Sequence, residues 1–141
     1  MDPKQFEELV GETWEAMPER FKKRVENVAL LIEEEPSEEV REREGLGPHE
    51  TLLGLYHGIP AIARGEMYGI GGVVPDTITL YRLPILEEAH RLSRERNYAS
   101  FDEAIAEAVR ETLWHEVGHY FGLSEGEIDE RESDGSNQFA P

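Results

Sequence analysis

The chain has 141 residues, no cysteine, and 31 acidic against 14 basic residues, which gives a formal net charge of −17. The length fits a single domain, and the lack of cysteine excludes disulfides, cysteine zinc sites and thiol chemistry, so any metal must be held by histidine and carboxylate. The negative charge would repel a phosphate backbone, which argues against nucleic acid as a partner. No apolar run approaches the ~20 residues of a membrane span, and the acidic N-terminal segment is unlike a secretory signal. We therefore expect a cytoplasmic protein that does not interact with membranes.

The first half of the chain contains helical and strand patterns in turn. Residues 3–17 carry apolar side chains at three- and four-residue spacings, which predicts a helix, and a shorter helical stretch is expected around 19–25. The apolar run from Val25 to Ile32 is too short and too β-branched for a helix and predicts a buried strand. Residues 33–50 are highly charged and contain Pro and Gly, so we expect a loop with room for one helical turn.

The middle of the chain alternates between strand and loop signals. Residues 51–59 (TLLGLYHGI) predict a second strand, closed by Pro60, and the glycine-rich segment 60–76 predicts a long loop. Residues 77–83 (TITLYRL) predict a third strand from their β-branched content. A helix is expected to begin at Pro84 and to run to about residue 97.

The last predicted helix has the strongest pattern. Ser100 and Glu103 form an S-x-x-E capping box ahead of apolar residues that recur at helical spacing to Phe121, and Gly122 is expected to end the helix. The whole pattern predicts an α+β fold, in which a small mixed sheet packs with helices and this C-terminal helix is the longest. We expect one domain over residues 1–132 and a polar tail over 133–141.

The sequence H-E-V-G-H lies on that helix at residues 115–119. Two histidines four residues apart share one face of a helix, so His115 and His119 can reach the same ion. Glu116 is rotated by about 100° from His115, which suits it to accept a proton from water rather than to bind the metal. Zinc fits this set, because neutral imidazole is a zinc ligand and the ion lowers the pKa of water toward ~7.

A third ligand has to come from outside the pair of histidines. Glu125 stands three residues after Gly122, where the metzincin pattern H-E-x-x-H-x-x-G-x-x-H supplies its third ligand. Two histidines and one carboxylate with an open position form a catalytic zinc set. The acidic stretch also offers Glu127, Asp129 and Glu130, of which Asp129 is the next candidate.

The sequence resembles the small bacterial minimal zincin family, whose members carry H-E-x-x-H-x-x-G-x-x-D/E. The resemblance rests on GLYHGIP (54–60), VPDTITLYRLPILE (74–87) and TLWHEVGHYFGLSE (112–125), and thus covers roughly the C-terminal two thirds of the chain. It implies a zincin-like metallopeptidase with the two motif histidines and Glu125 as zinc ligands and Glu116 as general base. The methionine turn of larger metzincins is missing, since no methionine follows the motif.

The leading hypothesis is therefore a zinc metallopeptidase that hydrolyses a peptide or an unstructured protein, with an edge strand at 51–57 or 77–82 pairing with the extended substrate. A domain this small offers a shallow cleft, which a partner protein could complete. The alternative is a non-catalytic zinc-binding or interaction module, in which Asp129 would close the metal site as a fourth ligand. His57, Tyr68 and Tyr81 are further candidates for substrate orientation or oxyanion stabilisation.

Overall fold

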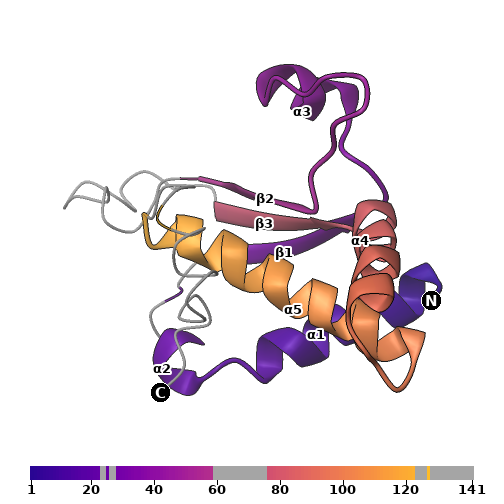
Figure 1. The fold of residues 1–141 in the computed structure, drawn as a ribbon. Helices are drawn as coiled ribbons and strands as arrows, with labels where there is room; N and C mark the ends of the chain where they lie inside the picture. The colour runs from indigo at the N-terminus through magenta and orange to yellow at the C-terminus, as the bar shows by residue number, and fades with distance from the viewer. Residues whose placement is uncertain (23–24, 26–27, 59–75, 123–126, 128–141) are drawn as a thin grey trace.

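The computed structural model describes residues 1–22, 25, 28–58, 76–122 and 127, which build a mixed three-stranded sheet and its surrounding helices (Figure 1). In chain order the elements are α1 (Pro3–Glu15), α2 (Glu19–Lys22), β1 (Val28–Glu33), α3 (Glu38–Arg43), β2 (Gly54–His57), β3 (Asp76–Tyr81), α4 (Arg82–Glu95) and α5 (Phe101–Tyr120). The sheet order is β1-β3-β2, so β3 is the central strand and β2 lies at an edge.

The sheet is mixed because its central strand has one parallel and one antiparallel neighbour. β1 pairs with β3 in parallel, in a register that aligns Val28 with Asp76. β2 pairs with β3 in antiparallel, and this register aligns Gly54 with Leu80 and Tyr56 with Ile78. Since paired residues and every second residue of a strand share a face, Gly54, Tyr56, Asp76, Ile78 and Leu80 all belong to one face of the sheet.

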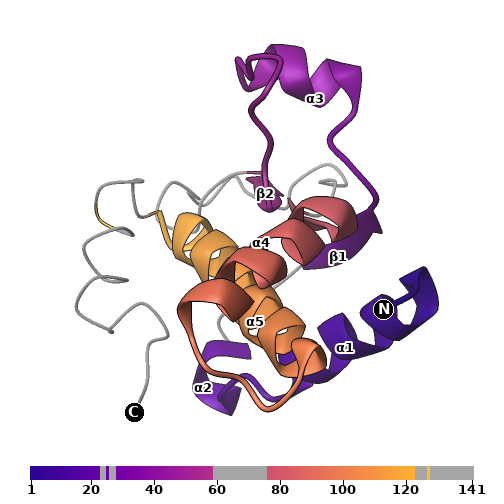
Figure 2. The same cartoon turned by 45° about the vertical axis from the view of Figure 1, so that its right-hand side comes forward.

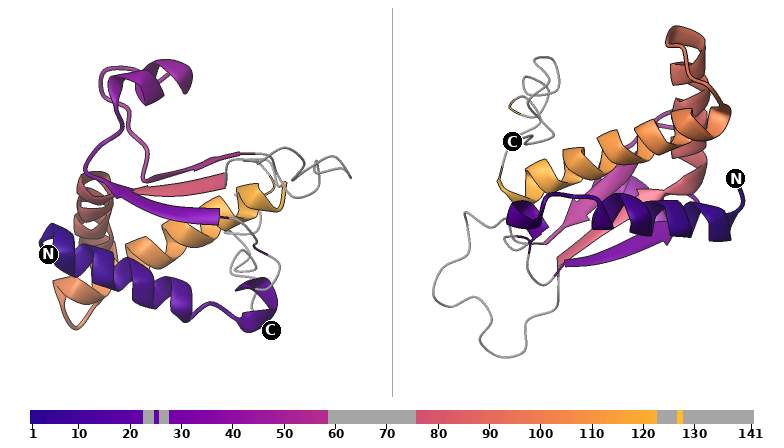
Figure 3. Two further views of the ribbon diagram at one scale, coloured as in Figure 1. Left: turned by 180° about the vertical axis from the view of Figure 1, so that it is seen from behind. Right: turned by 90° about the horizontal axis from the view of Figure 1, so that it is seen from below.

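That face is covered by α5 and α1, and α4 packs against α5 (Figures 2 and 3). Ile78 and Leu80 of β3 are fully buried against the helices. On α5 the apolar residues recur at spacings of three and four, which turns one continuous stripe of the helix toward the sheet. The central members of the core are Phe6, Val10, Ile78, Leu80, Ile85, Leu92, Ile105, Val109, Leu113 and Val117.

Helix α3 lies on the opposite side of the sheet from α5 (Figure 1). Ser37 caps its first turn by accepting a hydrogen bond from the Val40 amide at 3.2 Å. The Arg41 guanidinium then donates hydrogen bonds to the carbonyls of Gly47 and Glu50, at 2.6 and 2.9 Å, and so holds the segment that follows the helix against it. Because α3 buries none of its residues, side-chain caps and this arginine, rather than core packing, define its structure.

The predicted α+β class is confirmed, with a small mixed sheet and with the motif helix as the longest helix of the described chain. The bounds shift by a few residues: β1 ends one residue later than predicted, and α4 begins at Arg82, two residues before the predicted start at Pro84. Pro84 still lies in the first turn of α4, where a missing amide proton costs nothing.

Two expectations need correction. Residues 77–82 cannot form an edge strand, because β3 has β1 on one side and β2 on the other, which leaves 51–57 as the edge candidate near the motif helix. Residues 33–50, expected as a loop with room for one helical turn, contain the six-residue helix α3, which is longer than that single turn and whose Ser-x-x start is a capping signal. No helix in the described part of the chain has the length and apolar character of a membrane span.

Candidate functional site

The H-E-V-G-H motif occupies the last turns of α5. At the start of this helix the Ser100 hydroxyl accepts a hydrogen bond from the Glu103 amide at 3.3 Å, as the capping box predicts. Beyond its end Gly122 adopts a left-handed conformation with φ of 84°, and its amide donates to the His119 carbonyl at 2.9 Å. A glycine is favoured there because a Cβ would strain this backbone. The predicted start and stop of the helix are both confirmed.

His115 and His119 lie one turn apart, and their rings meet edge-on. The ring centroids are 5.2 Å apart at an interplanar angle of 70°, and both side chains are half-buried at the edge of a cavity. A zinc–nitrogen bond of about 2.0–2.1 Å with tetrahedral angles would separate two such centroids by roughly 5 Å. The separation of the two imidazole rings is therefore the one that a shared zinc ion would require.

Glu116 is buried, with 6% of its surface exposed, although it carries a carboxylate. Its Oε1 accepts a hydrogen bond from the backbone amide of Tyr56, at 2.8 Å, which joins α5 to the edge strand β2. Burial of a carboxylate is costly unless hydrogen bonds compensate for lost water. This bond therefore stabilises Glu116 and also sets its position relative to β2.

A cavity of about 770 Å³ lies along the junction of β2 and α5. Its walls include residues 51–56 on one side and Thr112, His115, Glu116 and His119 on the other. The motif residues and the backbone of the edge strand thus line one space. A cavity of this volume can enclose a few residues of an extended peptide.

The cavity also has an acidic lining, formed by Glu44, Glu88 and Glu111. Among the described residues that border the cavity there is no lysine or arginine. The carboxylates are partly compensated from outside, because Arg91 pairs with Glu88 at 2.5 Å and Arg96 pairs with Glu111 at 3.1 Å. The space between β2 and α5 is nevertheless lined by more negative than positive groups.

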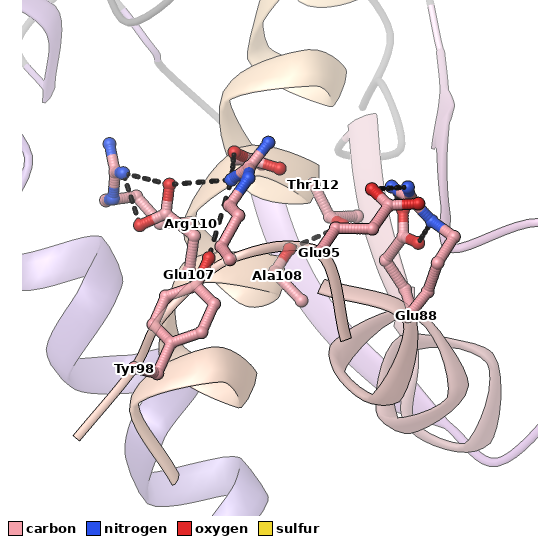
Figure 4. A network of polar contacts seen from close by, with 10 residues as sticks. Glu88, Glu95, Tyr98, Glu107, Ala108, Arg110 and Thr112 are labelled. Atoms are coloured by element: carbon pink, nitrogen blue, oxygen red, sulfur yellow. Dashed lines mark hydrogen bonds and ion pairs between the residues drawn. The ribbon is translucent and has the colours of Figure 1, made fainter. Parts of the chain in front are cut away.

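Glu111 also belongs to a polar network, because Arg96 contacts both Glu111 and Glu107. Figure 4 shows this network around Glu107 and Arg110. Burial raises the pKa of its carboxyl, and the Arg96 guanidinium opposes that rise. The neighbouring Glu107 has a lowered pKa, because hydrogen bonds from Arg110 and Glu111 outweigh its burial. Thr112 donates to the Ala108 carbonyl at 2.7 Å, as Figure 4 also shows. Glu111 therefore binds a proton more readily than an exposed carboxylate.

Two residues that the sequence analysis did not select also belong to the site. The Tyr56 hydroxyl donates to Oδ2 of Asp76 at 2.7 Å, and Asp76 is buried with 3% exposure. Gly58, with φ of 155°, lies against this carboxylate so closely that a Cβ would overlap it. The only sequence signal was the pair of glycines around Tyr56 in G-L-Y-H-G, since glycine in a strand often marks a close backbone approach.

Of the other residues that the sequence analysis proposed for the site, some lie in the described part of the chain and others do not. Glu125 and Asp129 lie outside the described residues, as does Tyr68, and the described Glu127 is exposed. Within the described ranges no group of three or more His, Asp and Glu side chains could hold a metal ion. His57 is exposed, and strand alternation places it on the face of β2 opposite Tyr56. The third ligand therefore stays a prediction.

Tyr81 is buried with 1% exposure, and burial is the main cause of its raised pKa. The charges of Glu33, Arg43, Glu44 and Glu116 also act on its pKa, and Tyr81 itself is not among the described residues that line the cavity. A buried hydroxyl at this place is poorly suited to contact a substrate held between β2 and α5. The position therefore favours a structural role for Tyr81.

H-E-x-x-H on one face of a helix is the zinc-binding motif of metalloproteases, and here α5 presents it to a cavity. The sequence model of a protein family described as "zincin-like metallopeptidase" matches this chain over residues 25–135. The chain therefore belongs to the zincin-like metallopeptidase family, and the match begins well before residue 54, where the resemblance seen in the sequence begins. Proteins of this family generally bind zinc.

A conserved hypothetical protein from Thermus thermophilus, whose structure is solved, is 26% identical in sequence to this chain. The match covers 84% of this chain and 92% of the Thermus protein, and the two structures superpose with a TM-score of 0.48. No curated protein matches the chain.

Proposed function

We propose that this protein is a zinc-dependent peptidase whose substrate is a short peptide or an unstructured segment of a protein. The observation that carries the proposal is the shared cavity, in which Glu116 and the two motif histidines line the same space as the edge strand β2. Membership of the zincin-like metallopeptidase family supports the same activity.

The histidines supply two of the donors that zinc requires, and Glu125 is the residue we propose as the third. When bound, zinc polarises a carbonyl oxygen and lowers the pKa of water toward ~7. The choice of zinc rests on imidazole ligands, which hard oxygen-preferring ions such as Mg²⁺ do not favour. Under this proposal, removal of any of the three side chains lowers metal content.

Glu116 would act as the general base and then as the general acid. Its carboxylate takes a proton from the attacking water and returns it to the leaving amine, which is a role that geometry and proximity favour. The Tyr56 amide keeps the carboxylate in place between α5 and β2, at the wall of the cavity. A fixed carboxylate loses less entropy on reaching the transition state than a mobile one.

Strand β2 would bind the substrate main chain. Within the described residues it has one hydrogen-bonded neighbour, β3. Apart from the Tyr56 amide, which binds Glu116, the main-chain groups on its other edge can therefore accept an extended peptide as an additional strand. The acidic lining of the cavity favours substrates with cationic side chains. The small size of the cavity favours short or unfolded substrates, and a partner protein that extends the cleft would broaden this range.

The test combines metal analysis with a peptide library. Wild type, Glu125→Ala and Glu116→Gln are expressed without chelators, their zinc content is measured, and each is incubated with a mixture of unstructured peptides. We expect one zinc per chain in wild type, loss of zinc in Glu125→Ala, and retained zinc with abolished cleavage in Glu116→Gln. Glu8→Ala, at an exposed position of α1, is the matched control and should keep both zinc and cleavage.

Two results would refute the proposal in different ways. If wild type takes up no zinc even when it is supplied, the metal site is wrong. If wild type binds zinc but cleaves nothing, and Glu116→Gln changes neither zinc nor stability, the non-catalytic zinc-binding module is the better account.

A further inference from the structure

We propose that Tyr56 and Asp76 form a positioning pair that holds Glu116 in its working position. The proposal rests on the proposed role of Glu116 as general base. Tyr56 lies between two buried carboxylates and donates one proton to each of them. Its amide donates to Glu116 Oε1 at 2.8 Å, and its hydroxyl donates to Asp76 Oδ2 at 2.7 Å.

The amide of Tyr56 is directed away from the sheet by the register of β2. The Tyr81 amide donates to the Leu53 carbonyl at 2.9 Å, so Leu53 belongs to the hydrogen-bonded set of this antiparallel pair. In such a pair every second residue bonds to the partner strand. Leu55 and His57 therefore bond to β3, while Gly54 and Tyr56 direct their main-chain groups outward, toward the side where Glu116 receives the Tyr56 proton.

Asp76 is a fixed anchor for the other end of the tyrosine. It is the first residue of the central strand, which has neighbours on both sides, and only 3% of its surface is exposed. Gly58 covers its carboxylate at a distance that only a glycine permits. A hydroxyl that donates to a charged, immobile acceptor makes a stronger bond than one between neutral groups. The ring of Tyr56, which also meets Tyr120 edge-on at 6.0 Å, is thereby held from its tip.

The two hydrogen bonds link Asp76 to Glu116 through a single residue, Tyr56. Asp76 fixes the tyrosine ring, the ring fixes the backbone at position 56, and the amide at that position fixes the Glu116 carboxylate. Tyr56 and Asp76 are positioning residues under this proposal. Neither of these two hydrogen bonds involves His115 or His119, so we expect metal binding to be retained when the bond to Asp76 is broken.

The test uses Tyr56→Phe and Asp76→Asn in the full chain, with Tyr98→Phe as the matched control. The Tyr98→Phe substitution also removes a tyrosine hydroxyl, but the Tyr98 hydroxyl accepts a hydrogen bond from Arg96 at 3.4 Å, away from Glu116 (Figure 4). Backbone amide NMR follows the proton at position 56, which Glu116→Gln identifies by its shift. Zinc content, kcat and KM are measured on the same samples.

We expect amide exchange at position 56 to become at least about 10-fold faster in both test variants and to be unchanged in the control. In the zinc-loaded protein kcat should fall by about 10-fold to 100-fold, with KM and zinc content within about twofold of wild type, as is usual for supporting residues around a catalytic site. A lower melting temperature alone would be the sign of a purely structural pair.

Unchanged exchange at position 56 in both variants would overturn the proposal, as would a fall in stability with kcat per folded molecule unchanged. If Asp76→Asn fails to fold, Tyr56→Phe decides, because it removes a single hydroxyl from a half-buried side chain. If wild-type protein cleaves no peptide, the proposed function fails, but the amide measurement still decides whether the pair positions Glu116.

Discussion

At Gly54 the edge strand β2 lies close to the motif helix α5. A Cβ at this position would lie 2.9 Å from Thr112 Cγ2, 3.1 Å from the Thr79 carbonyl oxygen and 3.2 Å from Glu116 Cγ. The first distance is shorter than a Cβ contact tolerates, and the other two leave little room for the atoms to move. We predict that Gly54→Ala forces β2 and α5 apart and destabilises the protein.

The magnitude follows from two opposing effects. Alanine restricts the unfolded chain more than glycine does, which would stabilise the fold by about 0.4–1 kcal/mol if the space were free. Overpacking of a well-filled site costs about 1–3 kcal/mol. The contacts around Gly54 involve a backbone oxygen and a β-branched side chain, so the second effect should dominate and leave a net loss of about 1–2 kcal/mol. For a chain of this length that corresponds to a fall in Tm of roughly 3–8 °C.

Calorimetry on two controls separates the contact from the general effect of alanine. Gly11 lies inside α1 with no atom within 4 Å of its hypothetical Cβ, so Gly11→Ala should raise stability by about 0.5–1 kcal/mol. Thr112→Ser removes the nearest methyl group but keeps the hydroxyl that bonds to Ala108. In that background Gly54→Ala should cost at least about 0.5 kcal/mol less, which is the coupling expected of residues in contact. Equal costs in the two backgrounds, or no loss at all, would refute the packing argument.

Three further predictions concern other parts of the chain. Ser100→Ala removes the cap of α5 and should lower the free energy of unfolding by about 0.5–2 kcal/mol in chemical denaturation, whereas a neutral result would mean that the 3.3 Å bond to Glu103 contributes nothing. Hydrogen bonds from Arg82 lower the pKa of Glu34 below its ordinary 4.5, so their contribution is present above that pH and is lost as the pH falls through the lowered value. Glu34→Gln should therefore flatten the acid side of a plot of Tm against pH, and an unchanged slope would contradict this. If the acidic lining selects substrates, Glu111→Gln should reduce the preference for lysine- and arginine-containing peptides over neutral ones by about two- to fivefold at low salt, and an equal preference in both proteins would exclude that role.

The elements that could be predicted from the sequence are those whose pattern is local. Helix α5 follows from a capping box, an apolar repeat and a terminal glycine, all of which lie between Ser100 and Gly122. The pairing of His115 with His119 follows from the pitch of that same helix. The charged segment that contains α3 lacked an apolar repeat, so its helix was underestimated: Ser37 and Arg41 hold it through hydrogen bonds that hydrophobic periodicity does not report.

The order of strands could not be predicted, because it depends on contacts between distant segments. Residues 51–57 and 77–82 have similar apolar content, yet only the first forms an edge. The partner of Glu116 was missed for a related reason: the donor is a backbone amide, and every residue except proline has one. The Tyr56 bond to Glu116 spans 60 positions of the sequence, and only the two flanking glycines hinted that β2 comes close to other atoms.

The residues of the segment G-L-Y-H-G (54–58) together connect β2 to the motif helix and to the central strand. The missing side chain of Gly54 leaves room for α5, and the missing side chain of Gly58 leaves room for the Asp76 carboxylate. Between them Tyr56 donates hydrogen bonds to Glu116 and Asp76. If β2 also binds the substrate main chain, then the strand that receives the peptide is the strand that holds the base. Changes to the backbone of β2 should then alter KM and kcat together. Loss of the Tyr56 hydroxyl should alter kcat more than KM, because the outward-facing amide at position 56 already binds Glu116 and is not among the groups left for the peptide.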